Sequence, residues 1–300
     1  MRSARMEKVV VIGGSGFLGS HTADELSRRG YDVTIFDSSQ SFWLQENQRM
    51  VIGDILDRDA LCSVLEGASV AYHFAGISDI NEAAQKPFET VNMNVLGTAN
   101  VLEALSTAKV KRFMYASTLY VYSSYGSLYR ASKQASETLI EAYQEMNDFD
   151  YTFMRYGSLY GPRSQAWNGI RRYVRDIVSQ GELFYDGTGK ERREYIHVSD
   201  ASRLSVDVLQ KNYRNQAVTI TGSQVLTSQE LIELIFEIAG LEENAHYLPE
   251  DKAQYHYSST PYRYTPKQAR KMVPGEFIDI GEGVLEMIEE LSSSASSDKE

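Results

Sequence analysis

The chain has 300 residues, of which 42% are hydrophobic, and a formal net charge of −11 at neutral pH. This composition is that of a folded globular protein with a sizeable core, and the negative charge argues against nonspecific nucleic-acid binding, which requires a basic surface. No apolar run reaches the roughly 20 residues that a membrane-spanning helix needs, and the single cysteine, Cys62, excludes an internal disulfide. These features predict a soluble cytoplasmic protein without membrane or nucleic-acid partners.

From residue 8 onward, short runs rich in β-branched residues alternate with amphipathic stretches. Strands are predicted at residues 8–14, 32–37, 49–54, 69–76, 112–118 and 150–157, and long helices at about 88–107 and 129–146. Such alternation is typical of right-handed β-α-β units, which build a mostly parallel sheet with helices on both faces. The sequence therefore predicts an α/β protein with a Rossmann-type, doubly wound parallel sheet.

After residue 160 the alternation weakens. Helices are predicted near 228–240 and 281–291, and strands return near 195 and 217. We interpret the chain as a sheet domain, a smaller C-terminal lobe over the ligand edge of the sheet, and a small, polar, disordered tail. The boundaries are 6–160 with 194–222 for the sheet domain, 161–193 with 223–291 for the lobe, and 292–300 for the tail.

The first strand-to-helix junction contains three glycines, Gly13, Gly16 and Gly19, in the run VIGGSGFLG. The first permits a tight turn, the second lets the backbone approach a pyrophosphate, and the third allows close helix–strand packing. The following helix offers free N–H groups to phosphate oxygens. Asp37, at the end of the next strand, can accept a hydrogen bond from a ribose 2′-hydroxyl but would repel a 2′-phosphate. This arrangement predicts a site for NAD rather than NADP.

Further motifs follow in order along residues 7–291: GDILD, YHFAG, NVLGTANVLEA, YASTLYVY, a Tyr-x-x-x-Lys pair, RYGSLYGPR and REYIHVSDAS. This ordered series resembles the extended short-chain dehydrogenase/reductases, in particular the NAD-dependent nucleotide-sugar epimerase/dehydratase family of the UDP-glucose 4-epimerase-like kind. The resemblance implies an NAD-binding sheet domain, a substrate-binding lobe, a nucleotide-sugar substrate, and a homodimer formed through helices 88–107 and 129–146. The cofactor-binding residues that it implies are Gly13, Gly16, Phe17, Leu18, Gly19, Asp37, Asp54, Ile55, Phe74, Ala75, Gly76, Asn94, Tyr129, Lys133 and Tyr156.

Tyr129 and Lys133 stand four residues apart, so on a helix both face the same side. The resemblance implies that Tyr129 is the catalytic acid/base, that Lys133 assists it, and that the Thr118 hydroxyl bonds the reacting sugar oxygen. A phenol has an ordinary pKa of about 10, and the positive charges of a lysine and an oxidised nicotinamide would favour its ionised form. We therefore expect Tyr129 to move a proton as hydride passes between the sugar and NAD.

On the substrate side, the loop after Thr118 departs from the family pattern. Relatives that eliminate water or decarboxylate place an acidic residue just after the catalytic Ser/Thr, where this chain has Leu119 and Tyr120. The loop is also short, so that Tyr120, Tyr122 and Ser124 are candidate sugar contacts. The substrate-binding residues that the resemblance implies are Ser78, Thr118, Ser158, Arg163, Arg193 and Arg263. Two basic clusters could bind an anion or could equally be solvated surface: Arg171, Arg172 and Arg175, and Lys190, Arg192 and Arg193.

With water elimination and decarboxylation disfavoured, the reaction expected is oxidation or reduction at one carbinol carbon. Performed twice in opposite senses, it makes the protein an NAD-dependent nucleotide-sugar epimerase, most simply at C4 through a transient 4-keto sugar, with Tyr129 as acid/base. Performed once, it makes the protein an NAD(P)-dependent reductase or dehydrogenase of a nucleotide-linked keto or hydroxy sugar. No Cys, His and acidic residues have metal-ligand spacing, so no metal is predicted.

Overall fold

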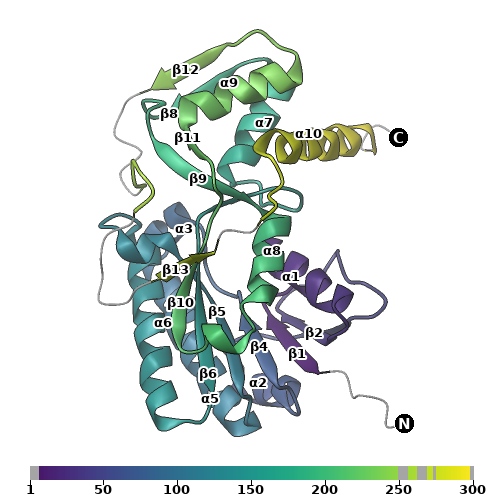
Figure 1. Cartoon of the computed structure of the whole chain (residues 1–300), viewed down its shortest axis with the longest axis vertical. Helices are drawn as coiled ribbons and strands as arrows, with labels where there is room; N and C mark the ends of the chain where they lie inside the picture. Colours follow the sequence, from purple (N-terminus) through teal and green to yellow (C-terminus); the bar gives the residue numbers. More distant parts are fainter. Residues whose placement is uncertain (1–6, 249–255, 262–268, 273–274, 298–300) are drawn as a thin grey trace.

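The structure is a computed structural model of the chain and describes residues 7–248, 256–261, 269–272 and 275–297. Its centre is an eight-stranded sheet in the order β13-β10-β6-β5-β4-β1-β2-β3, with neighbouring strands parallel (Figure 1). The strands are β1 (Lys8–Ile12), β2 (Asp32–Asp37), β3 (Arg49–Ile52), β4 (Val70–His73), β5 (Arg112–Thr118), β6 (Asp150–Tyr156), β10 (Gln216–Ile220) and β13 (Ala269–Met272). The chain runs outward from β1 to β3 and then returns to β4 on the other side of β1. The point where the strand order reverses therefore lies between β1 and β4, which is where open α/β sheets bind ligands.

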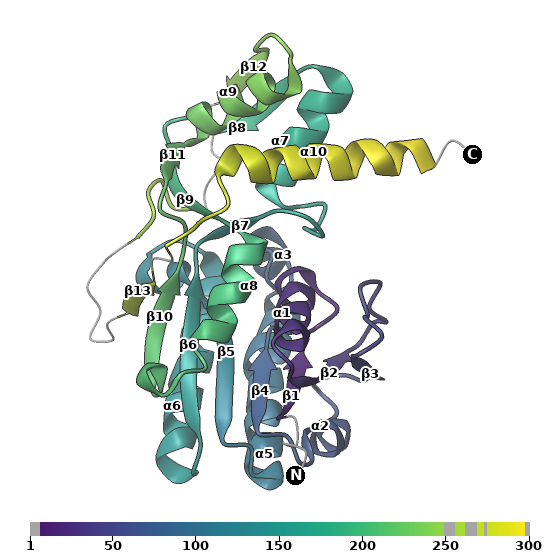
Figure 2. The same ribbon diagram turned by 45° about the vertical axis from the view of Figure 1, so that its right-hand side comes forward.

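Helices cover both faces of this sheet (Figure 2). One face carries α1 (Phe17–Arg28) and α8 (Val198–Asp207), and the other carries α2 (Arg58–Leu65), α5 (Gly97–Ala108) and α6 (Ser127–Met146). Along β1, Val9 and Val11 pack into the first core while Val10 and Ile12 pack into the second. A strand buried on both faces has a continuous apolar sequence, as KVVVI does. The predicted doubly wound parallel sheet is confirmed.

The helix predicted at 88–107 is interrupted. After α3 (Ile80–Gln85), the structure has α4 (Pro87–Thr90), a π-helical segment η1 (Val91–Leu96), and only then α5. A π-helical turn accommodates one extra residue and is frequent at functional sites. Here it carries Asn94, whose buried side chain reaches the loop after β4.

A smaller part of the chain lies beyond the carboxyl ends of the strands (Figure 1). It contains a three-stranded sheet of β7 (Ser158–Tyr160), β9 (Arg192–His197) and β11 (Val225–Thr227), and a two-stranded sheet of β8 (Leu183–Asp186) and β12 (Ala245–Leu248). The helices α7 (Gly169–Gln180), α9 (Ser228–Ala239) and α10 (Ile280–Ser297) share one apolar core with these strands. Short helical turns η2 (Leu119–Tyr122) and η3 (Lys211–Tyr213) complete the described elements.

Three boundaries differ from the prediction. The strand predicted near 195 is β9, which pairs with β7 and β11 rather than with the large sheet. Conversely, β13 lies in the segment interpreted as lobe but pairs with β10 in the large sheet, because a strand far along the chain can extend an open edge. The last helix also continues through Ser297, beyond the predicted end at 291, and Ser292 and Ser293 donate hydrogen bonds to carbonyls of its preceding turns.

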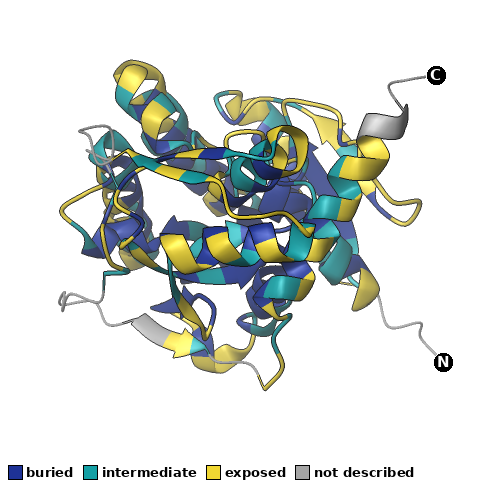
Figure 3. Cartoon of the chain, turned by 90° about the horizontal axis from the view of Figure 1, so that it is seen from above, coloured by how far each residue is buried: buried dark blue, intermediate teal, exposed yellow. Residues whose placement is uncertain are grey.

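Seen from above, the inner strands of the large sheet are buried, whereas the edge strand β3 and α10 have exposed residues (Figure 3). Across the part of the chain that the structure describes, no helix combines the length and the apolar character needed to cross a lipid bilayer.

Candidate active site

A cavity of about 1290 Å³ lies along the carboxyl ends of the strands, between the large sheet and the smaller part of the chain. Its wall includes residues from the loops after β1, β2, β4, β5 and β6, and from α7, β8 and β9. Sites for one small molecule usually measure roughly 300–1,000 Å³. The cavity therefore has room for more than one ligand.

The glycine loop forms the floor of one end of this cavity. Gly13 has a φ of +83°, and a Cβ there would lie 2.3 Å from the Ala75 nitrogen. A Cβ on Gly19 would lie 2.2 Å from the Gly13 oxygen. At Gly16 the nearest atom to such a Cβ is the same oxygen at 3.5 Å, an ordinary contact. Packing thus explains the glycines at 13 and 19, whereas Gly16 has space in the protein itself and lines the cavity.

Paired substitutions separate these two roles. Gly19→Ala is expected to cost about 3 kcal/mol in the free energy of unfolding, because its methyl group would overlap backbone atoms. Compared without bound dinucleotide, Gly16→Ala should unfold like the wild type, but it should lose most of its dinucleotide binding, because its methyl group would occupy the space of a pyrophosphate. Urea denaturation and quantification of the nucleotide released on denaturation check the two effects. A Gly16→Ala protein that retains its full complement of nucleotide would contradict this assignment.

Asp37 lies at the end of β2 and faces the cavity. Its Oδ2 accepts a hydrogen bond from the Ser15 nitrogen at 3.0 Å, and its Oδ1 accepts one from the Ser39 nitrogen at 3.1 Å. These bonds hold the carboxylate beside the glycine loop, as recognition of a ribose hydroxyl requires. The other predicted cofactor residues of this end that line the cavity are Phe17, Leu18, Asp54, Ile55, Phe74, Ala75 and Gly76.

Asn94 is not a wall residue, and its predicted cofactor contact needs correction. Its Oδ1 accepts a hydrogen bond from the Ile77 nitrogen at 2.7 Å, and its Nδ2 donates to the Ile77 oxygen and to Ser132 Oγ, both at 2.9 Å. These bonds tie the loop after β4 to α6. Asn94 is therefore a positioning residue, because its side chain is buried and its polar atoms bond to the protein.

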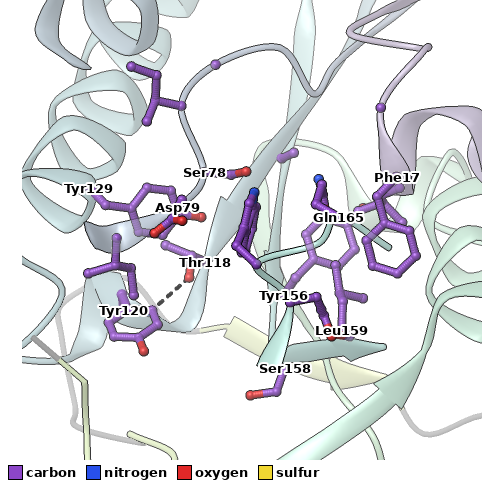
Figure 4. A pocket seen from close by; sticks show the side chains of 18 of the residues that line it. Phe17, Ser78, Asp79, Thr118, Tyr120, Tyr129, Tyr156, Ser158, Leu159 and Gln165 are labelled. Carbon is purple, nitrogen blue, oxygen red and sulfur yellow. Dashed lines mark hydrogen bonds between the residues drawn. The ribbon is translucent and has the colours of Figure 1, made fainter. Parts of the chain in front are cut away.

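Thr118, Tyr129 and Lys133 come together where β5 ends and α6 begins, and Figure 4 shows the first two facing the cavity. Thr118 lies close enough to Tyr129 for its hydroxyl to lower the pKa of the phenol. Thr118 Oγ1 also accepts from the Tyr120 nitrogen at 3.2 Å, which fixes the direction of the hydroxyl. Lys133 Nζ donates to the Ala116 oxygen at 2.8 Å and lies 4.8 Å from the ring centroid of Tyr115. The side chains predicted to be catalytic thus form one cluster.

Burial controls the ionisation of this cluster. It raises the pKa of Tyr129 to about 12, although the neighbouring Thr118 hydroxyl acts in the opposite direction. Burial likewise lowers the pKa of Lys133 to about 8, against the influence of Glu137. The expected acidification of Tyr129 by Lys133 is therefore absent in the protein alone, because the ammonium group bonds to a carbonyl and desolvation outweighs its charge.

A buried ion pair beneath the cluster was not predicted from the sequence. Arg155 of β6 donates to Glu137 of α6 through Nε, at 3.0 Å, and Nη2, at 2.6 Å. Glu137 Oε1 also accepts from Ser117 Oγ at 2.6 Å, and Arg155 Nη1 donates to the Tyr122 hydroxyl at 2.5 Å. Glu137 stands four residues after Lys133, so the helical spacing could have indicated that both face the sheet. This pair explains why Tyr122 is a packing residue rather than a sugar contact.

The predicted substrate-binding residues separate into two groups. Ser78, Ser158 and Arg193 line the cavity, but Arg163 does not. The Arg163 guanidinium donates to Asp24 at 2.8 Å and lies 4.8 Å from the Trp43 ring centroid, so the ion pair holds it outside the cavity. Arg263 lies outside the described residues. Tyr156 also lines the cavity, with its hydroxyl 2.6 Å from Ser205 Oγ.

Arg172 provides a second arginine in the wall, on α7. Neither its guanidinium nor that of Arg193 forms a hydrogen bond or an ion pair with another described side chain, and both influence the pKa of Tyr173. The basic run GIRRYVRDI indicated this region but not which arginine faces inward. Arg171 instead donates to the Ser164 oxygen, and Arg175 pairs with Asp176. Within the described residues, no group of three His, Cys, Asp or Glu side chains could hold a metal ion.

A glycine-rich β1–α1 junction, an acidic residue ending β2 and a Thr/Tyr/Lys cluster at the strand ends define a dinucleotide-dependent enzyme of the short-chain dehydrogenase/reductase type. Residues 9–221 match the NAD dependent epimerase/dehydratase family, and the chain belongs to that family. NAD is its cofactor, as predicted. The residues present fit this group, because Gly16 leaves its backbone open to the cavity and the Asp37 carboxylate faces the same space.

Curated relatives match along most of their length. A UDP-N-acetyl-alpha-D-glucosaminuronate decarboxylase from Bacillus cytotoxicus is 27% identical over 277 residues, covering 83% of this chain and 86% of the relative. A UDP-glucuronate 4-epimerase from Thermodesulfobacterium geofontis is 24% identical over 273 residues, covering 81% and 84%. The crystal structure of a UDP-glucose 4-epimerase from Thermotoga maritima superimposes with a TM-score of 0.84 at 22% identity, covering 96% of this chain and 99% of that one. The structural similarity shows a common fold.

Proposed function

We propose that this protein is an NAD-dependent epimerase that inverts C4 of a nucleotide sugar. The observation that carries the proposal is the cluster of Thr118, Tyr129 and Lys133 in a cavity too large for a single ligand. The names of two similar proteins, the UDP-glucuronate and UDP-glucose 4-epimerases, support the position of the reaction and a UDP-sugar as substrate.

In this proposal each member of the cluster has one role. NAD, when bound beside the glycine loop and Asp37, would supply the hydride acceptor and donor that a transient 4-keto sugar requires. Tyr129 takes the proton of the sugar hydroxyl and later gives it back. Thr118, the neighbour of Tyr129, bonds the reacting oxygen, and Lys133 contributes positive charge. Because burial raises the pKa of Tyr129 to about 12, the phenol needs the additional charge of the oxidised cofactor to act as a base near neutral pH.

We assign the substrate diphosphate to Arg193 and Arg172. Both guanidinium groups line the cavity without a carboxylate partner among the described residues. Arginine presents several donors in a planar fork that suits phosphate oxygens. In a protein of net charge −11, two such cations in one cavity are well suited to an anionic ligand.

The residues after Thr118 favour epimerisation over elimination or decarboxylation. Leu119 is fully buried and Tyr120 lines the cavity, so neither supplies a carboxylate for proton transfer at a neighbouring carbon. The same cluster would also serve a reductase or dehydrogenase acting once per turnover, and the experiment below distinguishes the two.

The purified protein is expected to release about one equivalent of NAD when denatured, and to convert UDP-glucose or UDP-glucuronate into its C4 epimer without added cofactor. The reason is that hydride taken from the sugar is returned within the same turnover, so no net redox change occurs. Chromatography measures the released NAD and the two epimers, and absorbance at the wavelength of reduced nicotinamide measures any consumption of added cofactor. Consumption of external cofactor in step with product would contradict epimerisation and favour the reductase or dehydrogenase.

We also propose a homodimer formed through the helical region 87–108 and α6. Phe88 is 80% exposed, and Val91 and Leu96 are each about half exposed. Large apolar side chains gathered on one exposed helical segment are typical of a surface that another protein covers.

A further inference from the structure

A row of aromatic side chains connects the catalytic cluster with Arg193. The ring of Tyr129 packs edge-on against that of Tyr120, with ring centroids 6.2 Å apart, and the Tyr120 and Tyr257 rings lie 4.5 Å apart. The Arg193 guanidinium lies 5.4 Å from the Tyr257 ring centroid. With the reacting carbon at Tyr129 and the diphosphate at Arg193, the sugar ring of the substrate runs along this row. Tyr120 is then beside the sugar, and it is the neighbour of Tyr129 in the row.

Tyr120 carries the polar group in the middle of the row. Its hydroxyl lies 2.9 Å from Nδ1 of His256, and both side chains line the cavity. Burial raises the pKa of Tyr120 well above its ordinary value. Burial also lowers the pKa of His256 to about 4, and Arg193 adds to this effect while Asp79 opposes it. The pair is neutral near pH 7, and in either tautomer it keeps one donor and one acceptor for another partner.

We propose that the hydrogen-bonded pair of Tyr120 and His256 recognises the substituent that projects from the sugar carbon next to the reacting one, and selects a neutral hydroxymethyl group over a carboxylate. This inference rests on the proposed function and concerns the choice of sugar. A hydroxymethyl group donates one hydrogen bond and accepts another, so it complements the pair. A carboxylate only accepts, and burying its charge beside neutral groups is costly.

The cations of the described cavity wall are Lys133, Arg172 and Arg193, and in this arrangement Arg172 faces the position assigned to the diphosphate. Lys133 donates to the Ala116 oxygen beneath the catalytic cluster. Arg193, which is assigned to the diphosphate, lies 5.4 Å from the Tyr257 ring centroid and is near enough to lower the pKa of both Tyr120 and His256. Leu119, the residue between Thr118 and Tyr120, is fully buried and offers nothing to the sugar. Tyr120, which stands in this loop where some relatives have an acidic residue, is therefore well placed to bind the substituent.

The test compares UDP-glucose and UDP-glucuronate as substrates of the NAD-loaded protein. We expect kcat/KM to be roughly 100-fold higher for UDP-glucose, the size of discrimination that polar mismatches in a binding site produce. Tyr120→Phe, which keeps the ring and removes the hydroxyl, should raise KM for UDP-glucose about tenfold with little change in kcat. It should leave the reaction of UDP-glucuronate nearly unchanged.

Tyr125→Phe is the matched control, because Tyr125 lines the same cavity, is 45% exposed and belongs to the same loop. It should react like the wild type with both sugars. A preference for UDP-glucuronate, or an equal loss on both sugars in Tyr120→Phe, would overturn this inference and leave the epimerase in place. If neither sugar were epimerised, the proposed function would fail first, and the inference with it.

Discussion

Replacing Tyr129 by phenylalanine is expected to lower kcat by about 10³-fold, the scale of a general acid/base contribution, while the protein stays folded and keeps its NAD. The substitution preserves the aromatic ring that packs against Tyr120 and removes only the hydroxyl. Among the described residues of this cluster, Lys133 cannot substitute as base without leaving the Ala116 carbonyl. The proton of the sugar hydroxyl then has no acceptor.

The measurement is single-turnover and steady-state conversion of the UDP-sugar, together with the amount of NAD released on denaturation. Tyr125→Phe again serves as control, because it removes a tyrosine hydroxyl from the same cavity wall without touching the cluster. Tyr129→Phe protein with more than a tenth of the wild-type kcat would mean that another group moves the proton. Loss of NAD in this variant would mean that the hydroxyl serves cofactor binding instead.

Features that depend on local spacing were predictable from the sequence. The turn at Gly13, the helix start behind Gly16 and the one-turn separation of Tyr129 and Lys133 are all set within a few residues of chain. The continuous apolar run of β1 also identified a strand buried on both faces. Family resemblance then supplied roles for these positions, and membership of the family is established over residues 9–221.

Features that depend on tertiary packing were not predictable. Arg172 faces the cavity because Ile170, Val174 and Ile177 turn the opposite side of α7 into the core. Arg163 is held outside the cavity by Asp24, a residue of α1 far away in the sequence. Nor could helical periodicity reveal the π-helical turn, which places Asn94 against the loop at Ile77. His256 reaches Tyr120 from a segment whose sequence carries no recognisable motif.

The second large effect is expected at the buried pair of Glu137 and Arg155, whose side chains are 4% and 2% exposed. Glu137→Leu or Arg155→Met should each lower the free energy of unfolding by about 3–5 kcal/mol, because each leaves the remaining charge buried without its partner. Folded domains have only about 5–15 kcal/mol of stability, so either change should move the urea midpoint far downward. The double variant Glu137→Leu/Arg155→Met should lose much less, since it buries no charge.

A double-mutant cycle on urea unfolding measures the interaction free energy between Glu137 and Arg155. The kcat of the double variant tests whether the pair also supports catalysis. Glu137 accepts from Ser117, the neighbour of Thr118, and it also opposes the lowering of the Lys133 pKa. A folded double variant should therefore have lower kcat, because Thr118 loses its support and the Lys133 ammonium loses its nearest carboxylate. Additive effects of the single substitutions would contradict the coupling. Wild-type kcat in a stable double variant would show that the pair stabilises the fold without positioning the catalytic cluster.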